Sequence, residues 1–83
     1  MDETLWSNVV MDKITNEQSV RKIMTQIYDT LKEKGYNPVN QIVGYILSED
    51  LTYITNQGGA RSLILRIDRD EFLKILLEEY LSV

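Results

Sequence analysis

The feature that most constrains the fold is a turn at Gly35–Pro38, which lies between two amphipathic stretches. Gly35 suits the left-handed backbone conformation that commonly follows a helix, because glycine has no Cβ that would clash there. Asn37 can cap the next helix, and Pro38 then falls in its first turn, where the missing N–H costs nothing. The segment therefore predicts two helices joined by a tight corner, and it carries no chemistry of its own.

The first helix is predicted at about residues 16–34. Its apolar residues recur at helical spacing, namely Val20, Ile23, Met24, Ile27, Tyr28 and Leu31. Thr15 and Gln18 have the spacing of a capping box, in which the hydroxyl and the amide each serve a free backbone N–H. Lys32 and Lys34 fall in the last turn, where the helix dipole favours cations.

The second helix, predicted at Pro38–Leu47, is apolar over most of its circumference. The apolar positions are Val39, Ile42, Val43 and Ile46, widened by Tyr45 and Leu47. Such a helix is normally buried on more than one side. Gly44 in its interior costs up to ~1 kcal/mol relative to alanine, so we interpret it as a contact point for a neighbour in the same chain or in a second copy. This interpretation predicts a dimer interface at Val43, Gly44 and Leu47.

Shorter elements and a last helix make up the rest of the chain. Asp50 can cap a single turn at Leu51–Ile54, and Thr55–Gly59 has the composition of a loop. A short helix is marked by Ala60, Leu63, Ile64 and Ile67. Asp70 is predicted to cap a final helix, whose apolar residues are Phe72, Leu73, Leu76, Leu77, Tyr80 and Leu81. Sustained strand alternation is absent from the sequence. The predicted fold is all-α, a compact bundle of four to five short helices.

The length of 83 residues is enough for one domain. We expect a single helical domain at residues 15–83 and a mobile or weakly docked N-terminal segment at residues 1–14, held through Trp6. A domain this small leaves apolar surface uncovered, so we expect a homodimer. No apolar run approaches the roughly 18 residues that span a bilayer, and the N-terminus lacks a basic region followed by an apolar one. A cytoplasmic protein without a membrane partner is therefore expected.

The composition excludes several classes of function. The chain has no cysteine and no histidine, which removes thiolate metal sites, disulfides and the commonest general base and metal ligand. Nine Lys plus Arg against thirteen Asp plus Glu give a net charge of −4, which is unfavourable for binding nucleic-acid phosphates. We therefore expect no enzymatic activity, no metal, no cofactor and no nucleic-acid partner.

The remaining charged and glycine-rich positions have simple explanations. Glu49 and Asp50 are adjacent and do not converge on one point, so a helix cap explains them better than a metal site. Gly58–Gly59 lacks the spaced glycines and the lysine of a phosphate loop. Three arginines surround the corner before the last helix: Arg61, Arg66 and Arg69. They form either a solvated edge or a site for the carboxylates of a partner.

Several segments together resemble a known family. These are EKGYNPVNQIVGYILSED at residues 33–50, TYI at residues 52–54 and ARSLILRIDRDEFLKILLEEYL at residues 60–81. They are similar to the IreB/ReoM family of small regulators from low-GC Gram-positive bacteria, over roughly residues 20–81. The resemblance implies an all-helical homodimer without enzymatic activity.

The same resemblance implies a function. Members of this family carry an N-terminal threonine that is phosphorylated by a membrane-bound PASTA-type serine/threonine kinase. They regulate peptidoglycan synthesis and β-lactam tolerance by controlling how a Clp protease degrades the first committed enzyme of the pathway. Asp2-Glu3-Thr4 resembles the acidic phosphoacceptor motif of the family, so Thr4 is the implied phosphoacceptor.

Two segments depart from the family pattern. Leu5–Asn8 stands where the family has an aromatic-polar-aromatic run, and Thr55–Gly59 stands where the family has a basic, proline-containing loop. Arg61 is retained from the basic cluster, with Arg69 further on. The alternative hypothesis is therefore a divergent helical dimer or interaction module that lacks the phosphorylation switch.

Overall fold

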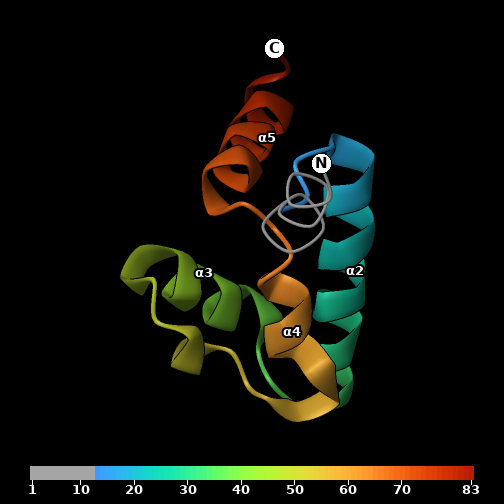
Figure 1. The fold of residues 1–83 in the computed structure, drawn as a ribbon, viewed down its shortest axis with the longest axis vertical. Coiled ribbons are helices and arrows are strands. Elements are labelled where there is room, and N and C mark those ends of the chain that lie inside the picture. Colours follow the sequence, from blue (N-terminus) through green and yellow to red (C-terminus); the bar gives the residue numbers. More distant parts are fainter. Residues whose placement is uncertain (1–12) are drawn as a thin grey trace, which may run out of the picture.

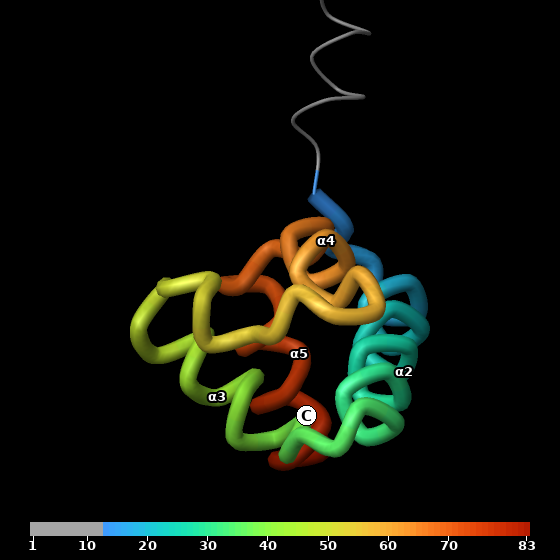
Figure 2. Tube along the Cα trace, turned by 90° about the horizontal axis from the view of Figure 1, so that it is seen from below, coloured from blue at the N-terminus to red at the C-terminus, as the bar shows by residue number. Residues whose placement is uncertain are grey.

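The computed structural model describes residues 13–83, which form helices joined by short connections (Figure 1). The elements in chain order are α2 (Glu17–Glu33), α3 (Pro38–Ser48), the 3-10 turns η1 (Leu51–Tyr53) and η2 (Gln57–Gly59), α4 (Ala60–Ile64) and α5 (Arg69–Leu81). The predicted all-α class is confirmed, including the short turns between the second and third predicted helices. Seen from below, α2 and α3 lie on opposite sides of the molecule, with α4 and α5 between them (Figure 2).

The start of α2 differs from the predicted capping box. The helix begins at Glu17, so its cap is Asn16, whose side-chain oxygen accepts a hydrogen bond from the Ser19 backbone N–H at 3.1 Å. Asn16 has the extended backbone of a capping residue, with φ −65° and ψ 132°. The predicted capping role of Thr15 is therefore wrong, because Thr15 lies one residue too early to reach the first free N–H groups.

The corner between α2 and α3 is confirmed in detail. Gly35 has φ +88°, its N–H donates to the Lys32 carbonyl, and the Tyr36 N–H donates to the Leu31 carbonyl at 2.9 Å. This pair of bonds is a Schellman motif, which satisfies the last carbonyls of the helix. Asn37 then accepts from the Asn40 N–H at 3.0 Å, with Pro38 as the first residue of α3. The chain thereby leaves the direction of α2 within four residues, and α3 runs across α2 (Figure 1).

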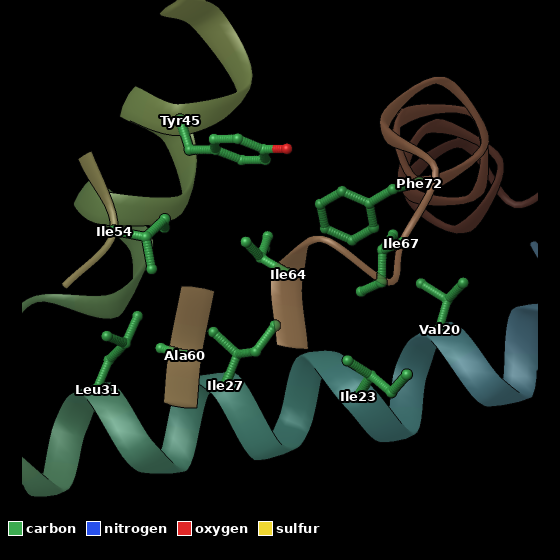
Figure 3. Close-up of a cluster of buried hydrophobic side chains, with 10 residues drawn as sticks. All are labelled: Val20, Ile23, Ile27, Leu31, Tyr45, Ile54, Ala60, Ile64, Ile67 and Phe72. Atoms are coloured by element: carbon green, nitrogen blue, oxygen red, sulfur yellow. The ribbon is translucent and has the colours of Figure 1, made fainter. Parts of the chain in front are cut away.

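The core forms along one face of α2 (Figure 3). Its ten buried side chains are Val20, Ile23, Ile27, Leu31, Tyr45, Ile54, Ala60, Ile64, Ile67 and Phe72. Ile27 and Leu31 are fully buried, and Ala60 of α4 lies over the same part of α2. Among the residues that the structure describes, no polar or charged residue other than Tyr45 is buried, so apolar packing dominates the stability.

The described chain begins with a short backbone pairing. The Ile14 N–H donates to the Arg66 carbonyl at 2.7 Å, and the Asp68 N–H donates to the Ile14 carbonyl at 3.4 Å. These bonds place Ile14 beside Ile67. The approach to α2 is therefore attached to the turn between α4 and α5. Trp6, the predicted docking residue, lies outside the described residues.

The start of α5 also corrects a prediction. Asp68, rather than Asp70, caps this helix, and its side chain accepts from the Glu71 N–H at 3.1 Å. Asp70 lies inside the first turn, where the dipole still favours its charge. The reason is again the position of the first helical residue, Arg69.

Two helices are more exposed than the sequence predicts. Within one chain α3 is contacted by α2 and by η1, but Tyr45 is its buried residue and one side stays exposed. In α5 the buried residue is Phe72. The exposed large apolar residues of the two helices are Val39, Val43, Leu47, Leu73, Leu76, Leu77, Tyr80 and Leu81. None of the helices in residues 13–83 is long and apolar enough to cross a membrane.

Candidate interaction surfaces

An apolar groove lies between α2 and α5. Its volume is about 380 Å³. Its apolar lining comes from Val20, Met24 and Tyr28 of α2, Ile42 of α3, and Phe72, Ile75 and Leu76 of α5. A concave apolar surface of this kind can accept a side chain or a helix of another molecule.

The rim of the groove carries a small network of charges. The Arg21 guanidinium lies 3.5 Å from the Glu17 carboxylate on its own helix and 3.5 Å from the Glu79 carboxylate on α5. All three side chains are more than half exposed, so the ion pairs contribute little to stability. They leave the apolar floor accessible from solvent.

The outer side of α5 continues the apolar surface of the groove. Leu76 lines the groove and is itself 45% exposed, and Leu73, Leu77 and Leu81 are exposed on the same helix. The sequence pattern predicts that these leucines are buried in the core, but within one chain they are exposed. A contiguous set of large apolar side chains on a monomer surface marks an interaction site. We call the groove together with this part of α5 the α5 face.

A second exposed apolar surface runs along α3. Val39, Val43 and Leu47 are spaced by four residues and therefore lie on one side of the helix. Tyr53 of η1, which is half exposed, lies against Gly44 of the same helix. We call these four residues the α3 face.

Gly44 has a neighbour within its own chain. A Cβ at Gly44 would lie 2.6 Å from Cδ1 of the Tyr53 ring, which real Cβ atoms essentially never do. Of the two alternatives that the sequence left open for Gly44, a contact inside the chain is therefore present. The predicted dimer interface at Val43, Gly44 and Leu47 stays a prediction, and Val43 and Leu47 are exposed.

We expect Gly44→Ala to lower the free energy of unfolding by about 1–3 kcal/mol, because the new methyl group must displace the Tyr53 ring. In a Tyr53→Ala background the same change should instead stabilise by up to about 1 kcal/mol, since alanine is the better helix former. Urea unfolding of the four proteins forms the double-mutant cycle that measures this difference. Equal effects of Gly44→Ala in both backgrounds would contradict the tight contact.

The three predicted partner-binding arginines have different roles. The Arg61 Nε–H donates to the Ile54 carbonyl at 2.7 Å and thereby holds the loop before α4. The Arg69 guanidinium lies 3.3 Å from the Glu49 carboxylate and 6.0 Å from the centroid of the Tyr45 ring. Arg66 is exposed, and its backbone carbonyl receives the N–H of Ile14. Binding of a partner through these arginines stays a prediction, for which Arg66 is the most accessible residue.

The acidic and glycine positions have structural roles. The Asp50 carboxylate accepts from the Thr52 hydroxyl at 2.7 Å and from the Thr52 N–H at 2.9 Å, and these bonds lower the pKa of Asp50. Gly58 has φ +65°, and a Cβ there would clash with the Thr30 methyl group, so this glycine permits close packing on α2. Within residues 13–83 no group of three or more Asp, Glu, His or Cys side chains is arranged to hold a metal ion.

Thr4, the implied phosphoacceptor, lies outside the described residues. The apolar residues of the α5 face are evident from the sequence pattern, but their exposure as a surface was not predicted. One feature of the sequence indicated this exposure. The short elements between α3 and α5 offer too little apolar surface to cover the whole apolar stripe of a 13-residue helix.

The comparison with known proteins gives one finding. The model of the family described as IreB regulatory phosphoprotein matches residues 2–82, which is nearly the whole chain.

Proposed function

Because the chain belongs to the IreB regulatory phosphoprotein family, we propose that it is a non-enzymatic cytoplasmic regulator that is phosphorylated on Thr4. The match itself carries this proposal, since it begins at residue 2 and so includes the Asp2-Glu3-Thr4 segment. By resemblance to the family, the kinase is of the PASTA type. The regulated process is peptidoglycan synthesis, through a Clp protease acting on an enzyme of that pathway.

The physical effect of the modification is a change of charge. A phosphate adds about −1.5 to −2 charges to a segment that already carries Asp2 and Glu3. Such a group binds guanidinium groups and repels carboxylates. The exposed side chain of Arg66 is one cation that the phosphate of the same or another copy could bind. Phosphorylation would thereby change which partner surface is accessible.

Phosphorylation of Thr4 can be tested directly. We expect incubation with the kinase domain of a PASTA-type kinase, ATP and magnesium to add one phosphate, detected by intact-protein mass spectrometry. The matched control is Thr4→Ala, which removes the proposed phosphoacceptor and keeps every threonine of residues 15–83. Wild-type protein that remains unmodified, or a Thr4→Ala variant that is modified equally, would contradict the assignment.

Self-association is the second part of the proposal. We propose that two copies associate through the α5 face, because it joins a groove of about 380 Å³ to the exposed leucines of α5. A two-fold axis lets each copy offer the same groove and the same helix to the other. This differs from the interface predicted at Val43, Gly44 and Leu47, because the contact with Tyr53 now accounts for Gly44.

The alternative function is an interaction module without the switch. The departure at Leu5–Asn8 favours it, because that segment follows the phosphoacceptor directly and a kinase would contact it. On this alternative, Thr4→Glu and wild type bind a purified partner with equal affinity. On the first proposal, their affinities differ.

A further inference from the structure

We propose that the α3 face binds an amphipathic helix of a partner protein, one that carries lysine or arginine beside its apolar side chains. The inference rests on the proposed regulatory function for its biological setting, because it gives that regulator a class of partner. Its physical basis is α3 and η1 alone. The α5 face, which the proposed self-association would cover, contains none of its four residues.

The shape of the α3 face suits a helix. Val39, Val43 and Leu47 span nine residues of helix, or about 12 Å between the first and the last at a rise of 1.5 Å per residue. Leu47 is 80% exposed at one end of this stripe. A partner helix with apolar residues at positions i, i+4 and i+7 presents a stripe of matching length.

Tyr53 enlarges the α3 face. The ring lies against α3 because Gly44 has no side chain, and 52% of the residue stays exposed. Tyrosine supplies a large apolar surface with a polar tip, and it is enriched at protein interfaces. Gly44 thus allows an aromatic side chain to extend the α3 face.

The end of this surface is held in place before a partner binds. The Ser48 hydroxyl donates to the Gly44 carbonyl at 2.7 Å and accepts from the Asp50 N–H at 3.0 Å. Glu49 is joined to Arg69 of α5. Less conformational freedom is therefore lost on binding than with a mobile loop.

The charge at the end of the α3 face selects the partner. Residues 38–59 contain no lysine and no arginine, and their only charged residues are Glu49 and Asp50. Both lie beside Leu47, at the helix end where the dipole is also negative.

Two arginines from later in the chain lie near these carboxylates: Arg69 is paired with Glu49, and Arg61 adds to the Thr52 hydrogen bonds that lower the pKa of Asp50. The Glu49 side chain is nevertheless 69% exposed against 30% for Arg69, so the carboxylate is the more accessible group at this end. An approaching helix with cations at this end is attracted, and one with carboxylates is repelled.

The test uses two synthetic helical peptides of 18 residues with identical leucine stripes. One carries lysines beside the stripe, and the other carries glutamates. Isothermal titration with the full, unphosphorylated chain should give at least tenfold tighter binding for the lysine peptide. Amide shifts in NMR spectra should be largest in α3 and η1.

Two pairs of variants separate specific binding from general attraction. Leu47→Ser should weaken binding of the lysine peptide at least fivefold, whereas Leu65→Ser, at an exposed leucine outside both faces, should leave it within twofold. The double variant Glu49→Gln/Asp50→Asn should weaken binding more than Asp29→Asn/Glu33→Gln, which removes the same charge from exposed positions of α2. Circular dichroism checks that each variant is folded.

Three results would overturn the inference: no binding of the lysine peptide, equal binding of the glutamate peptide, or amide shifts confined to the α5 face. Dissociation of a dimer by Leu47→Ser would also overturn it, because the α3 face would then be a self-interface. None of these outcomes depends on Thr4. Failure of the peptide experiment is therefore distinguishable from failure of the phosphorylation experiment.

Discussion

Replacing Ile27 by alanine is expected to lower the free energy of unfolding by about 2–5 kcal/mol, because it opens a cavity at the centre of the core. Ile27 is fully buried and lies between Ile23 and Leu31 on the inner face of α2. Small domains are stable by only about 5–15 kcal/mol, so this loss is a large share of the total. Urea unfolding followed by circular dichroism measures it.

The matched control for Ile27→Ala is Leu47→Ala, which removes an aliphatic side chain from an exposed site on α3. We expect it to change the stability by no more than about 0.5 kcal/mol. Both variants must be compared with wild type at one protein concentration, because self-association adds to the apparent stability. Equal losses for the two variants would contradict the position of the core along α2.

Replacing Leu77 by glutamate is expected to convert the proposed dimer to a monomer at micromolar concentration. Leu77 is 59% exposed within one chain, so the fold of the monomer should persist. In a dimer formed through the α5 face, the new carboxylate would lose its hydration without a partner. An increase of about 100-fold in the dissociation constant corresponds to about 2.7 kcal/mol and is a conservative expectation.

Light scattering coupled to size-exclusion chromatography measures the mass of each variant. The control is Leu47→Glu, which places the same charge on the α3 face and should leave the dimer intact. A wild-type protein with the mass of a monomer would exclude self-association at that concentration. If only Leu47→Glu dissociates the dimer, the interface lies at Val43, Gly44 and Leu47, as the sequence predicts, and not on the α5 face.

Most of the local structure could be predicted because it depends on residues close together in the chain. The corner at Gly35–Pro38 is specified by a positive φ, a capping side chain and a fixed proline ring. The capping of η1 by Asp50 was predicted for the same reason. The misplaced caps at Thr15 and Asp70 show the limit of this reasoning. Several polar residues precede each helix, and the first helical residue selects among them.

The candidate surfaces were less predictable because exposure depends on contacts between distant segments. Apolar periodicity identifies the face of α5 that avoids water, but it does not say whether this chain or another molecule covers that face. The same pattern predicted a buried stripe on α2, where the prediction is correct, and on α5, where most of the stripe is exposed. The family resemblance, by contrast, was recognised from local segments and is confirmed over residues 2–82.

The amino-acid sequence by itself therefore determined the helices, their corner, the family and the absence of histidine and cysteine chemistry. Each of these depends on residue types and short spacings. Only the tertiary structure decided that Gly44 receives Tyr53 and that Arg61 and Arg69 are held within the chain. It also decided that α3 and α5 keep apolar faces in solvent. The physical reason is that burial depends on how much surface the rest of the fold can cover, and a core of ten side chains in so short a chain leaves both helices partly uncovered.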